Sequence, residues 1–207
     1  MPLKSEVSHH SISDWDFEDG DEYRELSTAQ FVSPPTSLLY AGDGHGVNTR
    51  ILCRIPATLV LPQGEMRSWV YPSNSFFRLF MFRNQAVLGT ANFLNCYSLT
   101  IYANVARFSR WLVGVETIVD VTACHYFLNE WTRYRIVWYT GMSPREVEAI
   151  CLDLYYEVAG EWVKEGETMY HDDNLWVDEP VNRCGLTVYV LPANLIYFDD
   201  TEIWGPL

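Results

Sequence analysis

The chain has 207 residues, of which 48% are hydrophobic and 15% aromatic, a globular composition that excludes a disordered or fibrous protein. Its formal net charge is −13 at pH 7, with 14 basic against 27 acidic residues. A nucleic-acid binder needs a basic face that releases counterions, so we expect no nucleic-acid partner. The length suits one β domain.

The cysteines and the first residues indicate the compartment in which the chain is made. The five cysteines are an odd number without a C-x-x-C pair, which predicts buried free thiols rather than a zinc site or a complete disulfide framework. The opening MPLKSEVSHHSISDWDFEDGDEY lacks an apolar h-region, and no apolar run reaches the roughly 18 residues that span a membrane. We expect a product made in the cytoplasm without a signal peptide or membrane insertion.

In chain order, residues 1–13 are polar and predict a flexible N-terminal arm, followed by one domain over residues 14–207. A Gly/Asp-rich turn at 42–46 separates the first strand signals. The stretches NTRILCRIPATLV, SFFRLFMFRN and YSLTIYANV are rich in β-branched and aromatic residues. Turns recur at roughly 8 to 12 residues, which is typical of an all-β sandwich.

The second half contains the clearest strands. Residues 130–141 predict a strand with one aromatic and apolar face and one face carrying Arg133 and Arg135. The run AICLDLYYEVAGEWV alternates with period two and predicts the next strand. Between them, SPREVE matches a capping box and permits a helical turn at 144–148, but a helix continuing onward would contain too many β-branched and aromatic residues.

The last strand, NLIYFDDTEIW, contains two adjacent aspartates, a residue type that strands disfavour. By period two, Asp199 shares a face with Leu195, Tyr197 and Ile203, so we expect its carboxylate to point inward. Asp200 would lie with the opposite set. A buried carboxylate needs a partner.

Three stretches, in this order, resemble one group of proteins. DWDFEDGDEY followed by STAQFVSPPTSLLYAG is similar to the opening of jelly-roll carbohydrate-binding modules. EWTRYRIVWY followed by GEW resembles a concanavalin A-like and laminin-G-like strand pair, and CGLTVYV with YFDDTEIW resembles the closing strands of both groups. The resemblance covers most of residues 14–204. It implies an all-β, two-sheet antiparallel jelly-roll sandwich (concanavalin A-like) with at most a short helical turn.

The resemblance also implies a metal site. In the carbohydrate-binding modules an early Glu and a terminal Asp meet on adjacent strands and bind one structural Ca²⁺; here these positions are Glu18 and Asp199. The alternative is a hydrogen-bond cap in which Asp199 accepts backbone N–H groups.

No catalytic constellation is apparent, so we expect a protein that is not an enzyme. The carboxylate spacing of glucanases is absent, and Cys124 and His125 are adjacent, which directs their side chains apart on a strand. Glycan binding needs exposed aromatic faces, and four aromatic residues border Pro, Gly or acidic loops. These candidate ligand platforms are Trp69, Tyr71, Trp162 and Trp176.

Three hypotheses follow. The first is a non-enzymatic structural protein of a virus or phage particle (decoration, capsid-associated or tail protein), located in the virion and forming a homo-oligomer or binding other virion proteins; it rests on fold-level analogy. The second is a carbohydrate-binding module that recognises surface glycans outside the cell. A polysaccharide lyase or hydrolase is a third, ranked last.

Overall fold

The computed structural model describes residues 3–7, 15–17, 24–41, 48–53, 63–73, 76–84, 95–112, 115–142, 144–145, 148–170, 183–189 and 195–205. These residues form strands, turns and bends and contain no helix, which confirms the all-β prediction. Within this part of the chain there is accordingly no helix long and apolar enough to cross a membrane.

The strands form two antiparallel sheets. The larger has eight strands, which are, in spatial order, β13 (Glu161–Tyr170), β12 (Glu148–Val158), β11 (Thr132–Met142), β6 (Gly64–Pro72), β15 (Leu195–Trp204), β4 (Ser37–Ala41) and β3 (Arg24–Ser27), with β1 (Leu3–Val7) also paired to β15. The smaller has seven, in the order β10 (Val115–Ala123), β9 (Val105–Leu112), β8 (Asn95–Tyr102), β7 (Phe76–Asn84), β14 (Arg183–Tyr189), β5 (Asn48–Cys53) and β2 (Trp15–Phe17).

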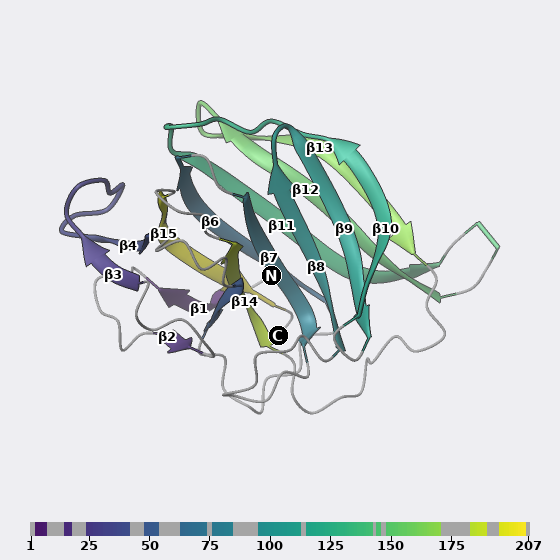
Figure 1. Cartoon of the computed structure of the whole chain (residues 1–207). Helices are drawn as coiled ribbons and strands as arrows, with labels where there is room; N and C mark the ends of the chain where they lie inside the picture. Colours follow the sequence, from purple (N-terminus) through teal and green to yellow (C-terminus); the bar gives the residue numbers. More distant parts are fainter. Residues whose placement is uncertain are drawn as a thin grey trace.

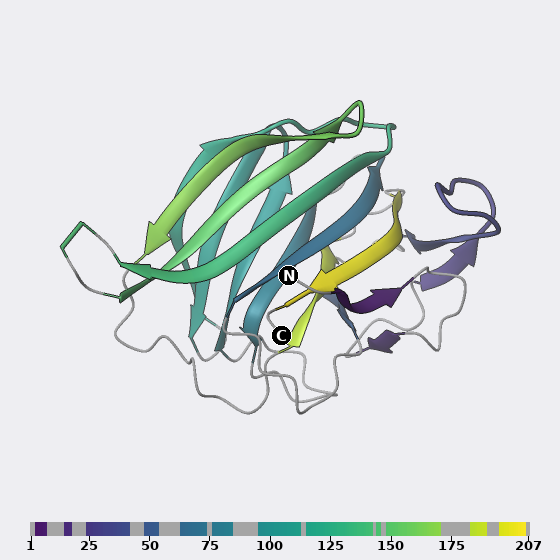
Figure 2. The same ribbon diagram turned by 180° about the vertical axis from the view of Figure 1, so that it is seen from behind.

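The sheets are stacked as two layers. Figure 1 shows β7 to β10 of the smaller sheet in front of β11 to β13, and Figure 2 shows the larger sheet from its other side. The hydrophobic core lies between them and includes the fully buried Tyr97, Trp138 and Phe198. This two-layer arrangement is the predicted jelly-roll sandwich.

The alternating patterns of the second half formed strands as expected. In β11, Thr132, Tyr134, Ile136 and Trp138 are buried while the residues between them are partly exposed, which confirms the predicted faces. The candidate helical stretch contains a turn at 144–145, and β12 has begun by Glu148. The β-branched and aromatic content after residue 148 favours the strand, as the sequence indicated.

The N-terminal arm requires a correction. Residues Leu3–Val7 form β1, which pairs with the last strand through Glu6 opposite Glu202 and Val7 opposite Thr201. This part of residues 1–13 is therefore a strand of the larger sheet. The segment that the resemblance placed beside the last strand begins at residue 14, but β2 (Trp15–Phe17), just before Glu18, pairs with β5 in the smaller sheet.

Candidate functional site

The candidate site lies on the outer face of the larger sheet, the face turned away from the smaller sheet. In β6, Met66 and Val70 belong to the core, so the alternate positions Arg67 and Trp69 point to this outer face. The same alternation places Arg133 and Arg135 of β11 there. These two arginines were predicted to share a face, but their partners were not predicted.

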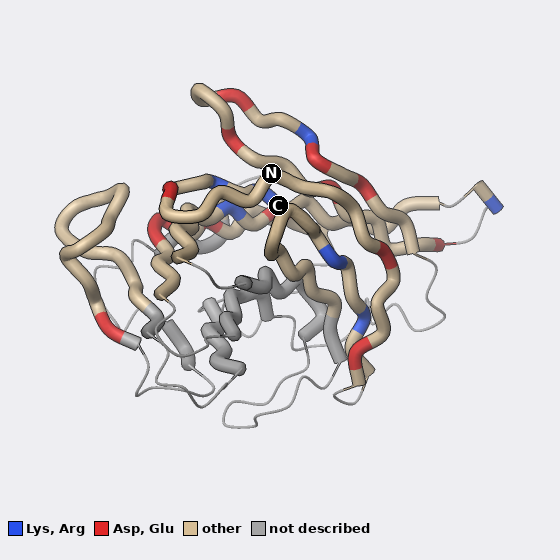
Figure 3. Tube along the Cα trace, turned by 45° about the horizontal axis from the view of Figure 1, so that its top comes forward, with Lys and Arg blue, Asp and Glu red and all other residues tan. Residues whose placement is uncertain are grey.

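The strand register aligns outer-face residues in rows across the sheet, because directly opposite residues of antiparallel strands share a face. One row runs from β13 to β15 and consists of Lys164, Tyr155, Arg135, Arg67 and Glu202. A second row places Arg133 opposite Trp69 and Trp69 opposite Asp199. Figure 3 shows acidic and basic positions next to each other along the strands of this sheet.

Six side chains of the outer face form an alternating series of ion pairs. We call it the Arg–Glu network, and its members in order are Arg135, Glu65, Arg67, Glu202, Arg133 and Glu157. The Arg135 Nη2–Glu65 Oε2 and Arg133 Nη2–Glu202 Oε1 distances are both 2.7 Å. Arg133 Nη1 lies 3.3 Å from Glu157 Oε2. Each guanidinium therefore has a carboxylate partner, and the network holds the side chains in fixed positions.

Trp162 covers the three arginines. Its ring centroid lies 5.7 Å from Cζ of Arg67, 5.6 Å from that of Arg133 and 5.8 Å from that of Arg135, all within the range of a cation–π contact. Adjacent strands lie about 4.8 Å apart, so β13 and β6 are separated by roughly 14 Å. The Trp162 and Arg67 side chains must therefore lean toward each other over two intervening strands.

Further aromatic side chains lie on the same outer face, beside the Arg–Glu network. Trp204 stacks on Arg67, with Cζ 4.5 Å from the ring centroid, and its Nε1–H donates to Glu202 at 2.8 Å. Tyr71, one of the predicted ligand platforms, contacts Trp131 and Tyr197 with ring centroids 5.6 Å apart in each pair. The outer face thus combines partly exposed indole and phenol rings with fixed polar groups.

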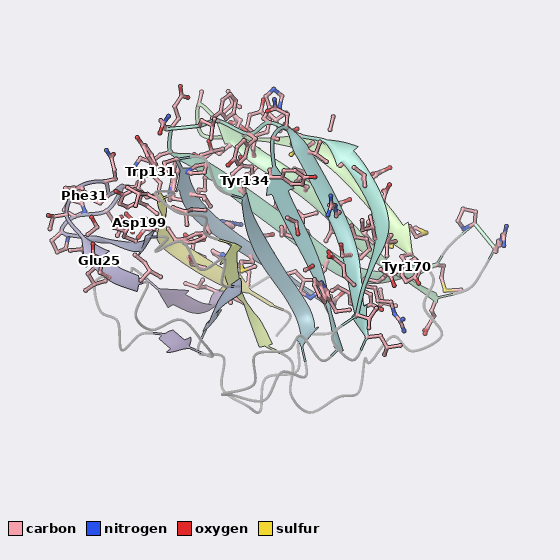
Figure 4. All side chains as sticks on the ribbon, viewed as in Figure 1. Glu25, Phe31, Trp131, Tyr134, Tyr170 and Asp199 are labelled. Carbon is pink, nitrogen blue, oxygen red and sulfur yellow. The ribbon has the colours of Figure 1, made fainter. Side chains whose placement is uncertain are left out.

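Asp199 also belongs to this side of the sheet, yet it is fully buried. The loop 28–36 accounts for this: the backbone N–H groups of Val32 and Ser33 donate to Asp199 Oδ2 at 2.7 and 2.9 Å. A third N–H, from Asp200, donates to Oδ1 at 2.9 Å. Burial raises the pKa of Asp199 above its ordinary value, and the amide hydrogen bonds from the loop partly offset that rise. Figure 4 shows Asp199 in the region of Phe31 and Trp131.

The predicted core-facing direction of Asp199 and its shared face with Ile203 were therefore wrong, whereas its burial and its shared face with Tyr197 were predicted correctly. Asp199 lies opposite Trp69, whereas Ile203 lies opposite Met66 and belongs to the core. A register shift between Asp199 and Glu202 exchanges the two faces within β15. Asp200, at the shift, has a φ of +40°, a backbone conformation that Asp tolerates better than most residues.

The described residues show the hydrogen-bond cap that was the alternative to calcium at Asp199. Both of its oxygens accept backbone N–H groups, and no three His, Cys, Asp or Glu side chains of the described residues are grouped to hold a metal ion. Glu18, the other predicted ligand, lies outside the described residues. A calcium ion shared by these two carboxylates therefore stays a prediction.

The structure brings three of the four predicted ligand platforms to one face. Trp69, Tyr71 and Trp162 all lie on the outer face of the larger sheet, and Trp176 is outside the described residues. Four further residues of this face were not predicted: Glu65, Arg67, Glu202 and Trp204. Their period-two spacing was visible, but their convergence depends on β6, β11 and β15 being neighbours, which no local pattern indicates.

Several titratable groups of the described residues have pKa values shifted by burial or by a hydrogen bond. Burial raises the pKa of Tyr155, and the nearby Asp153 carboxylate raises it further, so the phenol stays protonated at neutral pH. The hydrogen bond that Lys164 donates to Glu167 raises the pKa of Lys164, which keeps the ammonium charged. Cys124 and His125 diverge as predicted: Cys124 is buried, which raises its pKa to about 12, and His125 is exposed and contacts Glu165 at 2.6 Å.

Comparison with known proteins finds similarity in structure only. No protein-family model and no curated protein matches the sequence. The marine PL-14 alginate lyase from Aplysia kurodai matches with a TM-score of 0.67 and 12% identity over 100% of both chains. The carbohydrate-binding module CBM66 from Bacillus subtilis matches with a TM-score of 0.55 and 14% identity, over 93% of this chain and 96% of the other.

A third similar structure is the exoplasmic/lumenal domain of VIP36 bound to Ca²⁺ and Man3GlcNAc, with a TM-score of 0.59 and 7% identity over 97% of this chain and 87% of the other. At these identities the likeness shows the fold alone. It confirms the jelly-roll resemblance drawn from the sequence, and it includes both binding proteins and enzymes.

Proposed function

We propose that the outer face of the larger sheet binds a polysaccharide chain without cleaving it. The observation that carries this proposal is the position of Trp162 over three ion-paired arginines, with Trp69 and Trp204 beside them. Sugar rings offer an apolar face for stacking on an indole and hydroxyl groups around their rim. The indole rings suit the apolar face, and the fixed guanidinium and carboxylate groups suit the hydroxyls as donors and acceptors.

Pre-organisation supports binding at this face. The Arg–Glu network already fixes its side chains in the free protein, so that less conformational entropy is lost when a ligand arrives. The fold supports the proposal in a coarser way, because carbohydrate-binding and polysaccharide-cleaving proteins are among the similar structures.

Binding is favoured over catalysis by the state of the polar groups. A glycoside hydrolase needs one protonated carboxylic acid beside a second carboxylate. On this face Glu65, Glu157 and Glu202 each pair with a guanidinium, an interaction that requires the charged form. A lyase needs a base that removes a proton, and the raised pKa of Tyr155 disfavours that role.

The test is binding to a panel of soluble polysaccharides, measured by affinity electrophoresis and calorimetry. We expect binding by the wild type and an at least tenfold loss for Trp162→Ala, because the variant removes the central ring. Tyr102→Ala is the matched control, since Tyr102 forms a similar contact with Arg107 on the smaller sheet. Failure of the wild type to bind any member, or equal binding by Trp162→Ala, would contradict the proposal.

A reducing-end and double-bond assay on the same panel tests turnover. We expect no product, and release of oligosaccharides would replace the binding role with an enzymatic one. The virion location, the homo-oligomer and the virion partners expected from the sequence stay predictions, since no contact of the described residues bears on them.

A further inference from the structure

The Arg–Glu network indicates which class of polysaccharide the outer face accepts. An acidic polysaccharide carries a carboxylate on each uronate unit and needs guanidinium or ammonium groups that are free to pair with it. A neutral polysaccharide needs only hydrogen-bonding groups around an aromatic surface. The two classes therefore place opposite demands on the three arginines.

All three guanidinium groups are already neutralised. Arg67 pairs with Glu65 and Glu202, Arg133 pairs with Glu202 and Glu157, and Arg135 pairs with Glu65. Three positive groups face three negative groups, so the network carries no net charge. Its central carboxylates are well shielded, with side-chain exposures of 4% for Glu65 and 17% for Glu202.

The neighbouring cation, Lys164, is also paired with carboxylates. Lys164 contacts Asp153 Oδ1 at 3.1 Å and donates to Glu167, so this part of the face is slightly negative. The Nε–H groups of Arg133 and Arg135 have no acceptor among the described residues, but both are buried beneath the surface, out of reach of an arriving carboxylate. The whole chain adds a repulsive field, with a net charge of −13.

We infer that the outer face selects uncharged polysaccharides and rejects polyuronates, and that Glu202 sets this selectivity. The inference rests on the proposed polysaccharide binding. Glu202 joins two of the three arginines, so its carboxylate neutralises Arg133 and Arg67 together. Loss of that one negative charge leaves the network with a surplus guanidinium facing the ligand.

The first experiment compares ligands that differ only in charge. Polygalacturonate and its fully methyl-esterified form, and alginate and carboxyl-reduced alginate, are tested beside neutral β-glucan and mannan by calorimetry at 20 and 300 mM NaCl. We expect neutral polymers alone to bind, with affinities that change less than twofold with salt. Tighter binding of a polyuronate that weakens with salt would overturn the inference and leave the binding role intact, whereas no binding at all would remove both.

The second experiment tests Glu202 directly. Glu202→Gln keeps the size of the side chain and removes its charge, so we expect at least a tenfold gain in affinity for polygalacturonate and a steeper salt dependence. Glu161→Gln is the matched control, because it removes the same charge next to Trp162 from an exposed residue outside the network. Unchanged polygalacturonate binding by Glu202→Gln would contradict the role of Glu202.

A second variant covers the case in which Glu202→Gln does not fold. Glu157 is a terminal member of the network and contacts Arg133 alone among its arginines. Glu157→Gln should give a smaller gain for polygalacturonate, in the range of threefold to tenfold. Equal polyuronate binding by Glu157→Gln and Glu161→Gln would count against the inference.

Discussion

Asp199 is held by hydrogen bonds from the loop 28–36 rather than by an opposite charge. On one side of β15, pairing with β4 ends at Phe198 and pairing with β1 begins at Thr201. Asp199 lies between these two pairings, and its side chain accepts the N–H groups of Val32 and Ser33. Its neighbour Asp200 accepts a hydrogen bond from the Ser33 hydroxyl. The adjacent aspartates therefore fasten one loop to the last strand.

The raised pKa of Asp199 predicts a specific pH dependence of stability. The folded chain holds the Asp199 proton more tightly than the unfolded chain, whose Asp pKa is about 3.9. The resulting contribution to the free energy of unfolding is largest below pH 4 and is lost as pH rises through the folded pKa. Asp199→Asn has no such proton, so the wild-type stability minus that of the variant should decrease from pH 4 upward.

Urea unfolding of both proteins between pH 3.5 and 7 measures this difference. Asp200→Asn is the matched control, because Asp200 is half-buried and bonded to the same loop. A difference that rises with pH would contradict the assigned direction. Asp199→Ala should also lose about 3 kcal/mol, because it leaves three N–H groups without their acceptor.

The sequence predicted the faces of the strands best where apolar and polar residues alternate strictly. The faces of β11 followed directly from its pattern of apolar and charged residues. The faces of β15 did not, because the register shift after Asp199 breaks the period and carries Ile203 to the core. A bulge inserts one extra residue in one strand relative to its partner, so it depends on how neighbouring strands pair and is not predicted by the local sequence.

Strand β6 is the element on which the outer face depends, since it lies between β11 and β15. Gly64 starts this strand where its neighbours approach closely: a Cβ there would lie 2.5 Å from a ring carbon of Trp138 and 2.9 Å from the carbonyl oxygen of Trp204. Because glycine has no side chain, β6 can pack closely against Trp138 and Trp204 at this point.

We therefore expect Gly64→Ala to lower the free energy of unfolding by about 2 kcal/mol through overpacking. Gly160→Asn is the comparison, because Gly160 has a φ of +85° and no atom within 4 Å of a Cβ, so its cost should be at most about 1 kcal/mol. Chemical denaturation of the two variants checks the order. Equal or reversed losses would show that the contact with Trp138 is relieved without strain.

For the whole molecule, the sequence predicted the class of fold but not the position of the site. The jelly-roll sandwich followed from turn spacing and from the resemblance, and three of the four aromatic candidates lie on one face. The Arg–Glu network draws its members from β6, β11, β12 and β15, and residue 65 meets residue 135 only through the order of strands in the sheet. Long-range pairing of this kind is not a property of any sequence window.

The indole N–H signals of the eight tryptophans, observed by NMR during titration with a neutral oligosaccharide, test the central claim most directly. We predict that the signals of Trp162, Trp69 and Trp204 shift together, while that of the fully buried core residue Trp138 stays in place. Shifts confined to other tryptophans, with these three unchanged at saturation, would contradict binding on the outer face of the larger sheet.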